Sequence, residues 1–127
     1  MTQETNHAIE NAIASYETIV EWITRLNDGD EDVREEIDED PLSIEVRSDW
    51  HTPGENDNKP TEYLILLTTG GPALRIIGDL NEYCEPETAK LQWQDWGTPW
   101  NTIWKHETVD IDESVLLDYA RCFYYGE

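Results

Sequence analysis

Residues 62–80 read EYLILLTTGGPALRIIGDL, two apolar runs on either side of a pair of glycines. The first apolar run, Tyr63 to Leu67, has the length of a β-strand, and an unbroken apolar run of that length is typical of a strand covered on both faces. Gly70 and Gly71 separate it from a second apolar run. Glycine takes positive φ freely, so this spacing predicts a hairpin. The stretch therefore predicts the centre of an antiparallel sheet.

The segments on either side of this hairpin also alternate with a period of two. Downstream, AKLQWQ places Ala89, Leu91 and Trp93 on one face, which predicts a fourth strand after a turn at residues 81–88. Upstream, residues 51–60 read HTPGENDNKP, which is typical of a surface loop. Before that loop, apolar and polar residues alternate as in a half-buried strand, with these apolar members: Leu42, Ile44, Val46 and Trp50.

The two ends of the chain have the period of a helix. Near the N-terminus, apolar residues recur in steps of four and three, which predicts a helix over residues 6–26 with one buried stripe: Ile9, Ile13, Tyr16, Val20 and Ile23. That stripe could serve the core or a helix–helix homodimer. Near the C-terminus the same spacing predicts a helix capped by Asp110 or Asp112, with Gly126 beyond its end; its apolar members are Val115, Leu116, Tyr119 and Phe123.

Between the first helix and the sheet lies DGDEDVREEIDED, residues 28–40, with nine carboxylates and one arginine. Gly29 interrupts the first helix, Val33 and Ile37 lie four residues apart, and Pro41 prevents continuation, so a short helix over residues 30–39 is predicted. The whole order predicts a single α+β domain, in which a four-stranded antiparallel meander carries its helices on one face. Its parts are an acidic helical segment (1–40), the sheet (41–104) and a C-terminal helix (105–127).

Composition limits the classes of function. The chain has 127 residues and a formal net charge of −21, from 29 acidic and eight basic residues. Such a charge repels nucleic acid and anionic membranes and favours positively charged protein partners. No secretion signal or membrane span is evident, which predicts a cytoplasmic protein. Cys84 and Cys122 lack metal-type spacing and are expected to be free thiols.

Catalytic and metal-binding patterns are weak, so we expect neither an enzyme nor a cofactor. The three histidines are scattered, no serine or cysteine lies in a nucleophile turn, and TTGGPA lacks the lysine of a phosphate loop. Asp28, Asp30, Asp32 and Glu39 fit four positions of a calcium loop. Val33 occupies the position where that loop needs glycine, and Pro41 follows where a helix should begin, so no metal site is predicted.

Two stretches are candidate partner-binding sites. In the acidic run, carboxylates three and four residues apart on a helix lie roughly 5–6 Å from each other, close to the pitch of about 7 Å between DNA phosphates. The run could therefore imitate DNA, or it could be only a solvated face. The partner-binding residues predicted there are Asp28, Asp30, Glu31, Asp32, Glu35, Glu36, Asp38, Glu39 and Asp40. Further along, QDWGTPW offers a second site at Asp95, Trp96 and Trp100, either as an interface anchor or as packed structure.

A resemblance adds context. PLSIEVRSDWHTPGE, the stretch from EYLILLTTGGPALRIIGDL to QDWGTPW, and LLDYARCFYYGE resemble a family of small acidic proteins from phages and other mobile elements. Small acidic proteins of such elements often inhibit host CRISPR or restriction systems, some by resembling DNA, and the resemblance implies this context: an anti-CRISPR or antirestriction inhibitor that acts as a DNA mimic is expected. Its partner would be a positively charged DNA-binding protein or nuclease complex. The alternative is an acidic adaptor that binds a basic protein through Trp96 and Trp100.

Overall fold

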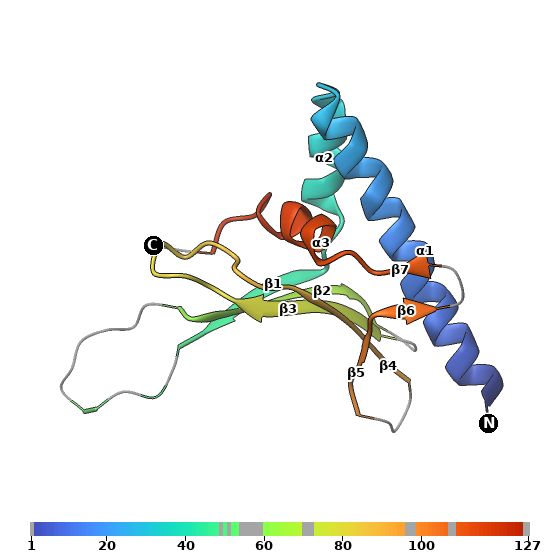
Figure 1. Cartoon of the computed structure of the whole chain (residues 1–127). Coiled ribbons are helices and arrows are strands. Elements are labelled where there is room, and N and C mark those ends of the chain that lie inside the picture. Colours follow the sequence, from blue (N-terminus) through green and yellow to red (C-terminus); the bar gives the residue numbers. More distant parts are fainter. Residues whose placement is uncertain are drawn as a thin grey trace.

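The computed structural model describes residues 2–48, 50, 52–53, 60–69, 73–95, 99–106 and 109–125, with the side chains of all of these except 2–7 and 106. Figure 1 shows three helices on one side of a twisted antiparallel sheet, and the predicted α+β class is confirmed. The helices are α1 (Thr2–Asn27), α2 (Asp32–Glu39) and α3 (Glu113–Ala120). The strands are β1 (Ser43–Arg47), β2 (Glu62–Thr68), β3 (Ala73–Asp79), β4 (Lys90–Gln94), β5 (Asn101–Ile103), β6 (Lys105–His106) and β7 (Val109–Asp110).

The main sheet is a meander in the order β1-β2-β3-β4-β5, and all its neighbours are antiparallel. The predicted hairpin of residues 62–80 is confirmed as the β2–β3 pair, with Ile65 opposite Ile76; the glycines of its turn lie outside the described residues. The prediction of four strands was one too few. The missing strand is β5, whose three residues are too short to show an alternating pattern.

The core lies between the helices and one face of the sheet. Alternate residues of β2, β3 and β4 point into it, and the predicted inward positions Ala89, Leu91 and Trp93 are buried. The buried stripe of α1 is rotated slightly from the predicted one: Ala12 and Ile19 are buried, while Ile9 and Val20 are half-buried at its edge. Tyr16 is buried, and its hydroxyl accepts a hydrogen bond of 3.0 Å from the Asp112 backbone N–H. The stripe therefore packs within the chain.

The alternation predicted before the loop was wrong for most of its apolar residues. In and around β1 only Ile44 packs against the core, whereas Leu42, Val46 and Trp50 are exposed. Trp50 is 102% exposed. The strand β1 lies at the edge of the sheet, and the three helices do not extend over the outer end of that edge (Figure 1). Alternation in sequence identified a strand there, but burial required a covering element.

The C-terminal helix is shorter than predicted. Lys105–His106 (β6) pairs antiparallel with Val109–Asp110 (β7), and α3 begins only at Glu113. Of the two predicted caps, Asp112 is the one used, because its carboxylate accepts the Ser114 backbone N–H at 3.0 Å. Leu116 and Tyr119 are buried as the spacing predicted. Phe123 lies past the end of α3 and still packs edge-on against Tyr119.

Candidate functional site

The acidic run forms a compact helix that is attached to the rest of the chain on one side only. Val33 and Ile37 of α2 are fully buried, and α2 packs against α1. Gly29, with φ of 95°, lets the chain reverse after α1. Asp30 then accepts the Asp32 backbone N–H at 3.1 Å and begins the new helix. Figure 1 shows α2 beside the last turns of α1, at the end of the helix layer that points away from the sheet.

Two arginines pair with part of the run. Arg25 of α1 contacts Asp30 at 2.9 Å and Glu36 at 3.5 Å, so it joins α1 both to the connection and to α2. Arg34 contacts Asp38 at 3.5 Å and also donates to the Cys122 carbonyl oxygen at 2.8 Å, beyond α3. Asp30, Glu36 and Asp38 therefore have ion-pair partners within the chain. We regard them as structural residues and not as part of the partner-binding surface.

The other carboxylates on the outer side of α2 are exposed and make no ion pair with any residue that the structure describes. We call Asp32, Glu35 and Glu39 the α2 acidic face. They lie three and four residues apart, which puts neighbours roughly 5–6 Å from one another on one side of the helix. Asp28 and Glu31 are exposed in the same way in the connection between α1 and α2. These five carboxylates are the part of the predicted site that remains free to bind.

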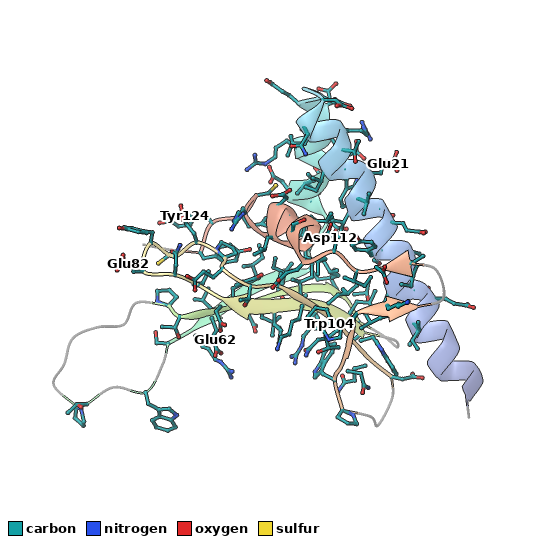
Figure 2. All side chains as sticks on the ribbon, viewed as in Figure 1. Glu21, Glu62, Glu82, Trp104, Asp112 and Tyr124 are labelled. Carbon is teal, nitrogen blue, oxygen red and sulfur yellow. The ribbon has the colours of Figure 1, made fainter. Side chains whose placement is uncertain are left out.

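A second row of carboxylates, absent from the predicted site, runs along α1. Glu10, Glu17 and Glu21 are exposed, and steps of seven and four residues put them on one side of a helix. Their separation along the axis is roughly 10 Å and 6 Å. Figure 2 shows Glu21 on the outer side of α1. The signal was present in the sequence, because all three residues lie off the apolar stripe at helical spacing.

Asp40 ends the run and has a structural contact. Its Oδ2 accepts a hydrogen bond of 2.5 Å from the hydroxyl of Tyr119, whose side chain is fully buried in α3. Burial raises the pKa of Asp40 above its usual value, and the hydrogen bond from Tyr119 opposes that rise without cancelling it. Asp40 was predicted to bind a partner; the geometry makes it a link between α2 and α3.

Replacing Asp40 with asparagine is expected to raise the melting temperature at neutral pH, because the amide oxygen still accepts from Tyr119 and carries no desolvated charge. A carboxyl whose pKa is higher in the folded state loses stability as pH rises through that pKa. The advantage of Asp40→Asn should therefore shrink as pH falls towards 4. Thermal unfolding of parent and variant at each pH measures this difference.

The control for this prediction is Asp40→Ala, which leaves the buried Tyr119 hydroxyl without its acceptor. Its free energy of unfolding should be about 1–3 kcal/mol lower than that of Asp40→Asn. Equal melting temperatures for Asp40→Asn and Asp40→Ala would mean that the hydrogen bond contributes nothing.

The second candidate site, QDWGTPW, follows directly after a tryptophan of the core. Trp93 is buried in β4, as its strand position predicted. Trp100 is half-buried, and the Arg75 guanidinium lies 4.0 Å from the centre of its ring. Arg75 in turn donates to Gln92 at 2.8 Å, which fixes this stack on the sheet. Asp95 is half-buried, and Trp96 lies outside the described residues.

The described residues were also examined for a metal centre. Among them, no three side chains of the metal-binding types converge on a point that could hold an ion. The residues of the calcium-loop template are divided between the connection and α2, because Asp32 and Glu39 are the two ends of that helix. Cys84 and Cys122 are free, as predicted, and burial raises the pKa of the Cys122 thiol.

We compared the chain with protein-family models, with curated proteins and with solved structures, and none matches it. Among the described helices, none combines the length and apolarity needed to cross a lipid bilayer.

Proposed function

We propose that this protein is a non-enzymatic inhibitor of a host DNA-targeting defence complex, either a CRISPR or a restriction system, and that it acts as a DNA mimic in the host cytoplasm. Its exposed carboxylates would occupy lysine and arginine sites that otherwise bind DNA phosphates. The observation that carries the proposal is the α2 acidic face. It consists of three carboxylates that pair with no described residue and lie at near-phosphate spacing, on a helix that is anchored from behind by Val33 and Ile37.

The rigidity of α2 supports this proposal over a purely solvated run. A flexible acidic tail would lose conformational entropy on binding, whereas carboxylates on a packed helix are already ordered. Arg25 contributes by bridging Asp30 and Glu36, because this contact fixes the position of α2 against α1. The row of Glu10, Glu17 and Glu21 extends the same charge along a second helix.

The distribution of charge also supports the proposal. Residues 1–40 contain 13 acidic and two basic residues, and both of those arginines pair with carboxylates of the run itself. Mutual repulsion of like charges destabilises a compact chain, so a segment that concentrates them has a cost. Binding in a positively charged channel would offset this cost in the complex. Electrostatic attraction would also accelerate association.

The alternative is an adaptor that binds a basic protein through Trp96 and Trp100, with the acidic run serving solubility. One observation bears on it: one face of the Trp100 ring already lies against Arg75. Trp100 therefore has less surface available to a partner protein than an interface anchor would offer. We retain DNA mimicry as the proposal. The mimic and the adaptor differ in which substitutions should abolish binding.

Competition with DNA tests the proposal directly. The immobilised protein is used to capture complexes from host lysate, and the retained complex is then challenged with target duplex DNA. We expect the DNA to release the complex, because both ligands would occupy one channel. Affinity should also fall at least tenfold when NaCl rises from about 0.1 M to 0.5 M, because salt screens charge pairs.

Polyglutamate at the same charge concentration is the control competitor. It should release the complex less effectively than DNA, since it offers the charge without the fixed spacing. A complex that target DNA cannot displace, or whose affinity does not change with salt, would contradict mimicry.

A further inference from the structure

The sheet has a second face that none of the described helices covers. Figures 1 and 2 show α1, α2 and α3 on one side of the sheet, whereas the other side carries side chains of the strands together with Trp100, which lies against Arg75. We call this other side the open face. The apolar run of β2 predicted a strand covered on both faces, yet Leu64, Leu66 and, on β3, Ile77 point to the open face and are half-buried. An antiparallel sheet that faces water normally has polar residues at such positions.

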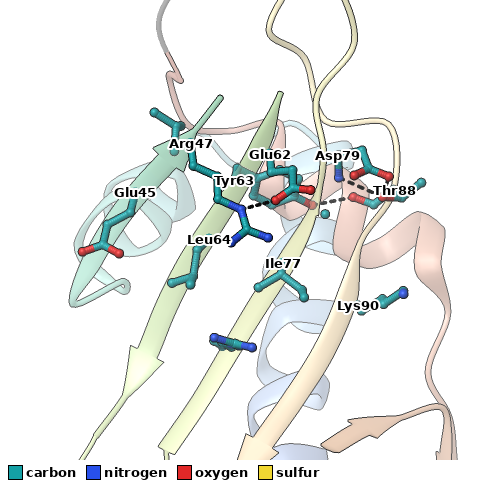
Figure 3. A pocket seen from close by; sticks show the side chains of 12 residues that line it. Glu45, Arg47, Glu62, Tyr63, Leu64, Ile77, Asp79, Thr88 and Lys90 are labelled. Carbon is teal, nitrogen blue, oxygen red and sulfur yellow. Dashed lines mark hydrogen bonds and ion pairs between the residues drawn. The ribbon is translucent and has the colours of Figure 1, made fainter. Parts of the chain in front are cut away.

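The open face also differs in charge from the rest of the chain. An open pocket of about 420 Å³ lies on it, with Leu64 and Ile77 among its lining residues (Figure 3). Its charged lining is balanced between three basic and three acidic residues, whereas the whole chain has a net charge of −21. The basic residues are Arg47, Arg75 and Lys90, and the acidic residues are Glu45, Glu62 and Asp79. A second copy would meet little net repulsion there.

One row across the sheet is complementary to itself. The register places Glu45 opposite Leu64, Leu64 opposite Ile77, and Ile77 opposite Lys90. Glu45 and Lys90, at the two ends of the row, are exposed. Neither makes an ion pair with another residue that the structure describes. Reversed, the row reads Lys90, Ile77, Leu64, Glu45, so each end meets its opposite charge and each apolar residue meets the other.

We propose that the open face binds a second copy of this chain. The two copies would be related by a two-fold axis that lies between the two sheets, parallel to the strands and level with the gap between β2 and β3. This operator places Glu45 of each protomer against Lys90 of the other and packs Leu64 against Ile77 twice. A two-fold interface must be self-complementary in this way. Sheets that pack face to face cross at about 30°, so rows far from the axis diverge and complementarity matters most near it.

The neighbouring rows are compatible with this arrangement. In the row Arg47, Glu62, Asp79 the operator sets Glu62 of each protomer near Asp79 of the other, and the ion pair of Glu62 with Arg47 within its own row reduces that repulsion. The Arg75–Gln92–Thr102 chain of hydrogen bonds, at 2.8 Å and 3.0 Å, fixes the polar side chains of the row on the other side. The carboxylates of α1 and α2 lie beyond both sheets. At physiological salt the Debye length is about 8 Å, less than the roughly 10 Å between packed sheets alone, so their repulsion is largely screened.

This inference is independent of DNA mimicry. The open face is on the opposite side of the sheet from the helices (Figure 1), so a dimer would leave both copies of the α2 acidic face accessible. Loss of the dimer would leave the acidic face of each protomer unchanged.

A charge exchange tests the dimer. Sedimentation equilibrium at physiological salt should show a reversible dimer for the parent. Glu45→Lys and Lys90→Glu should each weaken it by about tenfold or more, because each variant creates two like-charge contacts per dimer. The combination of Glu45→Lys and Lys90→Glu restores opposite charges and should return the dissociation constant to within about threefold of the parent.

The sign of the Glu45→Lys result separates this contact from a general charge effect. The substitution makes the chain less negative. If only the overall repulsion between two copies mattered, Glu45→Lys would therefore strengthen association. A parent that stays monomeric at all concentrations overturns the inference, and so does a dimer that the single substitutions leave unchanged. A combined variant that fails to recover, although its circular dichroism is native, overturns the pairing of Glu45 with Lys90.

Discussion

Replacing Asp32 with asparagine and both Glu35 and Glu39 with glutamine should weaken binding to the target complex by about a hundredfold or more and abolish inhibition. These three residues form the α2 acidic face and have no ion-pair partner among the described residues. An exposed ion pair contributes only about 0.2–1 kcal/mol, but pairs desolvated in a channel can contribute several times as much. Three such pairs together exceed the roughly 2.7 kcal/mol that corresponds to a hundredfold change.

The matched control changes the same number of charges elsewhere. Glu82, Glu85 and Glu87 are exposed in the turn between β3 and β4, and replacing all three with glutamine should leave inhibition within about threefold of the parent. The α2 variant should keep its native circular dichroism and an equal or higher melting temperature, since removing charges relieves repulsion. If the α2 variant inhibits as well as the parent at physiological salt, or if both variants lose inhibition equally, the α2 acidic face is not the binding surface.

Replacing Gly78 with alanine should unfold the protein or lower its melting temperature by about 10 °C or more. An added Cβ would lie 1.9 Å from the Thr88 carbonyl oxygen and 2.8 Å from the ring of Tyr63. Tyr63 is paired with Gly78 across the β2–β3 ladder, and its hydroxyl donates to that same carbonyl at 2.7 Å. Relieving the clash would require separating the backbone at the end of β3 from the backbone of residue 88, at a cost of about 3 kcal/mol or more.

Gly29→Ala is the comparison for this prediction. Gly29 has φ of 95°, but nothing lies within 4 Å of an added Cβ. Its substitution should therefore cost only the strain of positive φ, about 1–2 kcal/mol. Thermal unfolding of the two variants separates collision from backbone strain. A Gly78→Ala protein that melts within about 2 °C of the parent would show that β3 and residue 88 can move apart at little cost.

Local patterns in the sequence were enough to predict most elements of the fold. The steps of four and three from Ile9 to Ile23 indicated α1, and the alternation of Ala89, Leu91 and Trp93 indicated the inward face of β4. The position of α2 followed from Gly29, the pair Val33 and Ile37, and Pro41. Each of these signals lies within about one element, because residues that share a face recur at the period of that element.

The partition of the acidic run came only from the tertiary structure. Which carboxylates are free depends on Arg25 reaching across from α1 and on Tyr119 of α3 meeting Asp40. Asp40 and Tyr119 are 79 residues apart. Spacing along the run alone treats all nine carboxylates alike, since it contains no information about the element packed behind them.

The same limit applies to the strands. The alternation of Leu42, Ile44, Val46 and Trp50 predicts a strand equally well whether or not a helix lies over it, and the short β5 has too few residues to show a period. The apolar run of β2 indicated burial on both faces, while the helices of one chain cover only one. Periodicity determines which residues share a face, because that is a property of the local backbone. What covers each face is decided by the packing of elements distant in sequence, and for the open face we infer that this element belongs to a second copy.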